Sequence, residues 1–163
     1  MIQIARDIKP DLATLVPEKR AELTTEGGLD VIVHAEDLNS AIGRLHDRKI
    51  PVSLFVDPNP AQIQQAKDIN ADFIEIHTGA FCDAILDVDK DAAFSKIIEA
   101  AKIASQLGLG VNAGHGLCYQ SIKRFAGLSE ITEFSIGHSI VSRAALVGMK
   151  QAVSDMLALI KEL

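Results

Sequence analysis

Glu75 lies in a short run, DFIEIHT (residues 72–78), that has the alternating pattern of a β-strand. Because successive side chains of a strand point to opposite faces, we expect Ile74 and Ile76 to face surrounding helices and Glu75 and His77 to face the interior. A carboxylate that loses water there must be paired or protonated, and such groups are common at functional sites. Glu75 is therefore a candidate catalytic residue. A structural carboxylate bonded to a neighbouring strand is the alternative.

His115 stands between two glycines in the segment NAGHG, residues 112–116. An imidazole titrates near neutral pH and can donate or accept a proton. The flanking glycines let the backbone turn tightly and come close to a ligand. This pattern favours a role in proton transfer, and the alternative is a loop histidine that caps the next helix.

Two further segments carry residues that could bind a ligand. Gly137 and His138 end a predicted strand and begin a predicted helix, where free backbone N–H groups attract phosphate. A plain turn is the alternative there. The segment TTEGG, which begins at Thr24, combines hydroxyl groups with two glycines and indicates a polar loop, although many loops have this composition. His77 is a ligand contact or a partner of Glu75.

These residues permit two kinds of enzyme chemistry. One is acid–base catalysis on a phosphorylated substrate. The other is a zinc or iron site built from a carboxylate and three imidazoles. The four candidate ligands for this alternative are Glu75, His77, His115 and His138. The chain has no HxH or HExxH spacing, which counts against the metal.

Regular elements that could position these residues alternate along the chain. Strands are predicted at 11–16, 51–57, 72–78, 110–114 and 133–137. Helices are predicted at 1–9, 36–48, 60–70, 91–107 and 119–126, and from about 139 to the end. Asn59 is a plausible N-cap for the third of these helices. Strands joined through helices pair in parallel, because parallel pairing needs a crossover connection.

The pattern favours a parallel (β/α)8 barrel over an open doubly wound sheet. No GxGxxG fingerprint follows a strand, whereas polar residues recur at strand ends, as in a barrel. These residues are Thr24, Asp57, Glu75 with His77, Asn112 with His115, and Gly137 with His138. Five strands suggest a partial barrel, and we expect one domain over 1–163 with three N-terminal βα units missing.

Composition narrows the class of protein. The formal net charge of −6 argues against nucleic acid as a partner, because phosphate backbones favour clustered Lys and Arg. No signal peptide or membrane-spanning apolar run is visible, so a cytoplasmic location is expected. Cys82 and Cys118 form neither a CxxC pair nor a zinc spacing, and we interpret both as reduced.

Five segments together resemble the pyridoxine 5'-phosphate synthase family, in the family's order. They are LVPEKRAELTTEGGLD (15–30), VSLFVD (52–57), FIEIHTG (73–79), VNAGHGL (111–117) and SIGHSIVSRA (135–144). The resemblance implies a barrel enzyme of vitamin B6 biosynthesis that condenses 3-amino-2-oxopropyl phosphate with 1-deoxy-D-xylulose 5-phosphate to give pyridoxine 5'-phosphate, phosphate and water. It implies no metal or organic cofactor, and it implies a homo-oligomer, commonly an octamer.

The resemblance also implies roles for individual residues. His115 matches the family's proton donor, and Glu75 matches the carboxylate that stabilises the transition state. Thr24 matches a contact to the deoxyxylulose phosphate. Contacts to the aminooxopropyl phosphate are matched by Gly116, Gly137 and His138.

Motifs that the family carries on its first three strands are not found in this sequence. They are an Asn-x-Asp-His motif, a His-x-Arg motif and a Glu, and they include the residues taken to be proton acceptors. We therefore expect this chain by itself to make no product. The alternative from a different class is a non-catalytic half-barrel that oligomerises or binds a phosphorylated ligand without turning it over.

Overall fold

Strands and helices alternate through the computed structural model, which describes residues 1–17 and 27–163. The strands are β1 (Ala13–Leu15), β2 (Val52–Val56), β3 (Phe73–His77), β4 (Gly110–Gly114) and β5 (Glu133–Ser135). The helices are α1 (Ile2–Ile8), α2 (Ala35–His46), α3 (Pro60–Asp68), α4 (Gly79–Asp83), α5 (Asp87–Gln106), α6 (His138–Val147) and α7 (Met149–Ile160), with a short 3-10 helix, η1 (Ser121–Phe125).

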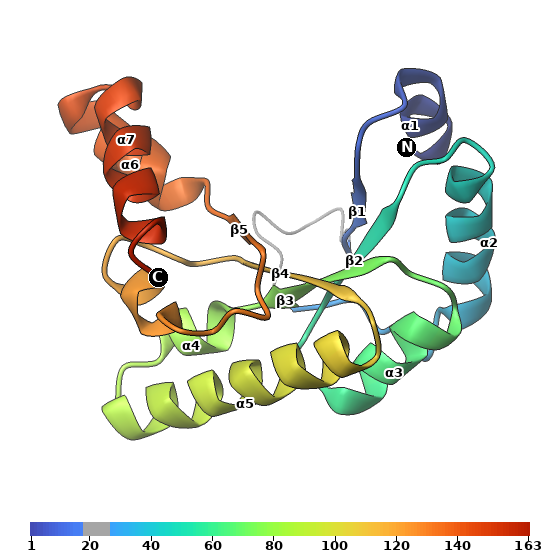
Figure 1. Cartoon of the computed structure of the whole chain (residues 1–163), viewed down its shortest axis with the longest axis horizontal. Coiled ribbons are helices and arrows are strands. Elements are labelled where there is room, and N and C mark those ends of the chain that lie inside the picture. Colours follow the sequence, from blue (N-terminus) through green and yellow to red (C-terminus); the bar gives the residue numbers. More distant parts are fainter. Residues whose placement is uncertain (18–26) are drawn as a thin grey trace.

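The five strands form one curved parallel sheet in the order β1-β2-β3-β4-β5 (Figure 1). Each strand pairs with the next one along the chain, so the order never reverses as it does in a doubly wound sheet. Helices α2, α3 and α5 lie along the outside of this arc (Figure 1). The predicted parallel barrel-type fold, here an arc of five strands, is confirmed.

The core lies between the sheet and its outer helices. Strand β2 is buried along its whole length, as expected for a parallel strand covered on both faces. Helix α5 contacts β3 and β4. It presents Ile97 and the small residues Ala100, Ala101 and Ala104 to the core, and all four are at most 1% exposed. Ile74 and Ile76 are fully buried in the same core, on the side that the alternation predicted.

An aromatic cluster anchors the segment between β4 and β5. The Phe125 ring of η1 lies 5.9 Å from Phe81 of α4, 5.1 Å from Phe94 of α5 and 5.3 Å from Phe134 of β5, measured between ring centroids. All three contacts are edge-on, which is a favourable geometry for aromatic pairs. The cluster therefore ties the loops after β3 and β4 to the body of the fold.

Most element boundaries agree with the sequence-based expectations, and three features differ. The predicted helix at 119–126 is only the short 3-10 helix η1, and α4 was not predicted. The expected long C-terminal helix is divided at Gly148, whose φ of +83° cannot continue a right-handed helix. The predicted N-cap is confirmed, because the Asn59 side chain accepts a hydrogen bond from the Ala61 N–H at 2.9 Å.

The aromatic cluster leads to a stability prediction. Replacing Phe125 by Ala removes a ring that is 1% exposed and leaves a cavity among three others, so we expect a loss of about 3–5 kcal/mol in the free energy of unfolding. Urea denaturation measures this loss. The control is Ile85→Ala, at a residue 94% exposed, for which a change below about 0.5 kcal/mol is expected. Equal effects of the two substitutions would contradict the packing described here.

Candidate active site

A pocket of about 750 Å³ lies where strands β3, β4 and β5 end and helix α6 begins. Its lining includes Glu75, His115, Gly116, Gly137 and His138. The fold thus brings together five candidate residues that are spread over 64 positions of the sequence, from 75 to 138. Thr24, the sixth candidate, lies outside the described residues.

Glu75 is half-buried, and its carboxylate lies over Gly114 of the neighbouring strand β4. In the sheet register His77 lies beside Gly114, and Gly114 lies beside Ser135. A Cβ at Gly114 would lie 2.3 Å from Oε1 of Glu75, so only glycine at this position leaves room for the carboxylate. Burial raises the pKa of Glu75, the charge of Glu133 adds to this rise, and a hydrogen bond with the Ser135 side chain opposes it. Glu75 therefore holds its proton more tightly than an exposed glutamate.

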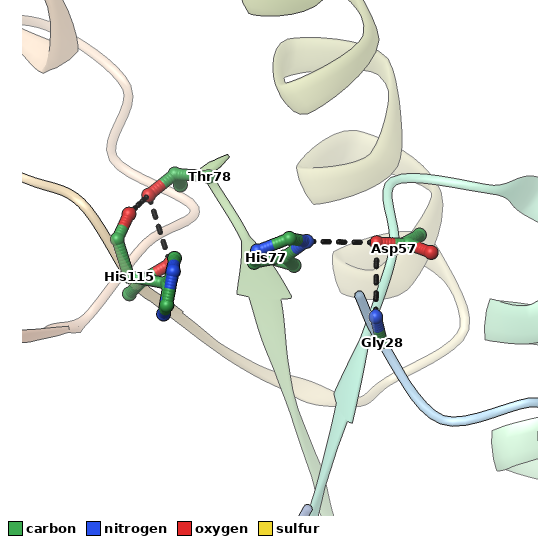
Figure 2. A network of polar contacts seen from close by, with 6 residues as sticks. Gly28, Asp57, His77, Thr78 and His115 are labelled. Atoms are coloured by element: carbon green, nitrogen blue, oxygen red, sulfur yellow. Dashed lines mark hydrogen bonds and ion pairs between the residues drawn. The ribbon is translucent and has the colours of Figure 1, made fainter. Parts of the chain in front are cut away.

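His115 is held in an unusual backbone conformation. Its φ is +79°, in the left-handed region that non-glycine residues rarely adopt, and Gly116 follows with φ +76°. The Thr78 hydroxyl lies within hydrogen-bond distance of the carbonyl oxygens of Gly114 and His115, and the Thr78 N–H donates to Gly114 O at 2.9 Å (Figure 2). Strained residues of this kind persist where surrounding contacts hold them, and they cluster at functional sites.

Electrostatics at His115 favour the neutral imidazole. Burial lowers its pKa, and the charge of His77 lowers the pKa further, while Asp83 acts in the opposite direction. Once protonated, His115 is therefore a stronger acid than an exposed histidine. Such a group can deliver a proton to a substrate in the pocket.

The partner of His77 is Asp57, which the sequence interpretation did not assign to the site. His77 Nδ1 lies 2.9 Å from Oδ1 of Asp57, which also accepts from the Gly28 N–H at 3.1 Å (Figure 2). These contacts lower the pKa of Asp57, with the His77 hydrogen bond as the largest cause. The sequence held only part of the signal, because Asp57 and His77 each lie at the end of a predicted strand. The pairing of Phe55 with Glu75, which makes the residues two further along each strand neighbours, comes from the structure.

A second pocket, of about 890 Å³, is lined by both Asp57 and His77. Its lining also includes Gly79, Lys96 and His115. His115 is the residue that the two pockets share. The ring of His115 therefore stands between the space that contains Glu75 and the space that contains Asp57 and His77.

The start of α6 closes the first pocket. Gly137 precedes the helix and His138 is its first residue, and both are exposed. The first N–H groups of any helix have no acceptor within the helix, and the helix dipole makes this end positive. The Ser139 hydroxyl donates to the Leu117 carbonyl oxygen at 2.9 Å, which ties this helix start to the loop after β4. The arrangement suits a phosphate group.

The alternative of a metal site is not supported by the positions of its proposed ligands. Within residues 1–17 and 27–163, no three His, Cys, Asp or Glu side chains are grouped so that they could hold a metal ion. Glu75 and His138 line the first pocket, whereas His77 lines the second and is bonded to Asp57.

Within residues 1–17 and 27–163, no helix combines the length and apolar character needed to cross a membrane.

Solved structures with a similar fold have low sequence identity. The tryptophan synthase A-subunit of Pyrococcus furiosus superposes with a TM-score of 0.58 at 14% identity, over 99% of this chain and 59% of that one. A chain of the Amycolatopsis orientalis BexX/CysO complex superposes with a TM-score of 0.56 at 15% identity, over 99% of this chain and 62% of that one. These likenesses support the barrel-type fold alone.

Comparison of the sequences is more specific. The pyridoxine 5'-phosphate synthase of Desulforapulum autotrophicum is 56% identical over 163 residues, which are 100% of this chain and 68% of that protein. The enzyme of the same name from Desulfosudis oleivorans is 58% identical over 98% of this chain and 68% of its own length. The family model described as "Pyridoxal phosphate biosynthesis protein PdxJ" matches residues 1–162. The chain therefore belongs to the PdxJ family, whose relatives named here are pyridoxine 5'-phosphate synthases.

Proposed function

We propose that this chain provides the proton donor, the stabilising carboxylate and a phosphate site for the synthesis of pyridoxine 5'-phosphate. The reaction is the condensation of 3-amino-2-oxopropyl phosphate with 1-deoxy-D-xylulose 5-phosphate. The observation that carries the proposal is the convergence of Glu75, His115, Gly116, Gly137 and His138 on one pocket. Membership of the PdxJ family supports the choice of reaction.

The proposed roles follow from the chemistry that a condensation requires. An amine and a ketone form a Schiff base by losing water, and ring closure also expels inorganic phosphate. Both leaving groups depart more readily when protonated, so a proton donor accelerates the loss. His115 is assigned this role, because its pKa lies below that of an exposed histidine and its ring borders the pocket.

Glu75 is assigned the stabilisation of positive charge. A Schiff base formed from an amine and a ketone is cationic when protonated, and a fixed carboxylate in a partly dry pocket stabilises such a cation more strongly than water does. The position of the carboxylate, above Gly114 and beside Ser135, supports this assignment. The phosphate of the aminooxopropyl substrate is assigned to the Gly137–His138 turn, and Thr24 is proposed to contact the other substrate.

A cytoplasmic location and a homo-oligomeric assembly remain part of the same proposal.

The first prediction concerns His115. In a preparation that turns over both substrates, His115→Ala should slow product formation by roughly 100-fold or more, because a general acid is lost. The chain is assayed alone and together with a separately expressed segment covering the remaining length of a relative. The control is His46→Ala, whose imidazole pairs with Asp72 outside both pockets. Turnover of His115→Ala close to that of wild type would remove His115 from the mechanism.

The second prediction concerns Glu75 and pH. Because the pKa of Glu75 is raised in the folded chain, its ionisation destabilises the fold as pH rises from the ordinary value of 4.5 through the raised pKa. Glu75→Gln should therefore raise Tm at neutral pH, and this gain should disappear at lower pH. The substitution should also impair turnover. Thermal melts across pH measure the change in Tm, and the product assay measures turnover. A Glu75→Gln chain that has lost cooperative melting would support a purely structural role.

Asp57→Asn serves as the control of opposite sign. The pKa of Asp57 is lowered in the folded chain, so its ionised form stabilises the fold above the ordinary value of 3.8 and this contribution is lost as pH falls through the lowered pKa. Asp57→Asn should therefore lower Tm at neutral pH. Shifts of the same sign for both substitutions would contradict the electrostatics described here.

The third prediction concerns phosphate. A crystal structure determined in the presence of phosphate or sulfate should show an anion at the start of α6, bonded to backbone N–H groups. The start of α5 is the internal control, because Asp87 and Asp89 in its first turn repel anions. An empty Gly137–His138 turn with anions bound elsewhere would overturn this placement. Binding of phosphate with no turnover even after addition of the segment that covers the remaining length of a relative would instead favour a non-catalytic half-barrel.

A further inference from the structure

The hydrogen bond between Asp57 and His77 determines the orientation of a buried imidazole. His77 is 8% exposed, and its Nδ1 lies 2.9 Å from a carboxylate oxygen of Asp57. An ionised carboxylate only accepts hydrogen bonds, so the proton of this bond is on Nδ1 of His77. The Gly28 N–H, at 3.1 Å, holds the same carboxylate oxygen from a second side. Nε2 is thereby directed away from Asp57.

On its other side, His77 packs against His115. The two ring centroids are 4.9 Å apart, the rings meet edge to face at 62°, and His77 lies between Asp57 and His115 (Figure 2). Phe55 contacts both imidazoles, with centroid distances of 5.1 Å to His77 and 6.4 Å to His115. The position of one imidazole therefore limits the positions open to the other.

The space around the two rings leaves no room for a larger residue at position 79. A Cβ on Gly79 would lie 2.6 Å from Nε2 of His77 and 3.3 Å from Cδ2 of His115. Nε2 of His77 is buried and has no hydrogen-bond partner among the described residues. A buried polar atom without a partner is costly, and such atoms persist where function requires them.

We propose that Asp57 and His77 are positioning residues, which orient the imidazole of His115 toward the pocket that contains Glu75. The inference rests on the proposed function, in which His115 is the proton donor. Neither Asp57 nor His77 lines the pocket of Glu75, so both act through His115. The arrangement is an Asp–His pair behind a reactive imidazole, and its carboxylate fixes which nitrogen of His77 carries the proton.

The same contacts link the two sites electrostatically, because the ring of His77 lies between the Asp57 carboxylate and the ring of His115. The charge of His77 contributes, after burial, to the lowered pKa of His115. Besides Asp57 and His77, the titratable groups that share a pocket with His115 are Glu75, Asp83, Asp89, Lys96, Cys118, Tyr119 and His138. Of these, Asp83 raises the pKa of His115.

The chain contains a matched pair that serves as a control. His46 Nε2 lies 2.8 Å from Oδ2 of Asp72, and Asp72 also accepts from the Val52 N–H at 2.8 Å. In each of the two Asp–His pairs, a backbone N–H is a second donor to the carboxylate: that of Gly28 for Asp57 and that of Val52 for Asp72. Asp72 precedes the start of β3, whereas His77 ends that strand, so the control pair lies at the opposite edge of the sheet.

The first test uses the unmodified chain and imidazole ¹⁵N NMR. His77 should carry a proton on Nδ1, because this nitrogen faces the Asp57 carboxylate. A His77 ring whose only proton is on Nε2 would overturn the proposal. This readout does not depend on turnover, so failure here is distinguishable from failure of the proposed reaction.

The second test uses His77→Phe, which keeps an aromatic ring against His115 and Phe55 but removes the charge and the bond to Asp57. The pKa of His115, followed by NMR, should rise toward the value of an exposed histidine. The same substitution at His46 should leave the pKa of His115 unchanged. A pKa of His115 that is the same in His77→Phe and wild type would show that His77 only fills space.

Discussion

Parallel pairing of consecutive strands is the constraint on which the rest of the structure depends. Strands that pair in parallel end at the same edge of the sheet, so residues that follow different strands are brought together there. Asp57, Glu75, His77 and His115 meet for this reason, although 58 positions separate the first from the last. The first turn of α6 reaches the same edge after β5 and completes the pocket.

Placing ionisable groups at this edge costs stability. The carboxylate of Glu75 is ionised less readily than in water, and the backbone of His115 adopts a conformation that few non-glycine residues tolerate. The surrounding fold holds both in place. The aromatic cluster around Phe125 anchors the segment after β4, and Thr78 bonds to the carbonyl groups beside His115. A rigid shell of this kind keeps reactive groups in a working geometry.

The site divides into a pocket side and a supporting side, with His115 between them. Glu75 and the start of α6 lie on the pocket side, where a phosphorylated substrate is proposed to bind. Asp57 and His77 lie on the supporting side, in the second pocket. The fold is shared with proteins only 14% and 15% identical to this chain, and a barrel architecture by itself does not decide the chemistry.

Local pattern in the sequence determined the strands, most helices and the face on which Glu75 lies, because alternation and helical spacing are properties of short segments. Motifs around Glu75, His115 and Gly137 also indicated the family. Pairing between distant segments was decided only by the tertiary structure. The sequence left His77 as a possible partner of Glu75, whereas the register of β2 and β3 gives it Asp57. The structure also shows that the backbone of Gly148, at φ +83°, divides the last helix and that residues 121–125 form a 3-10 helix.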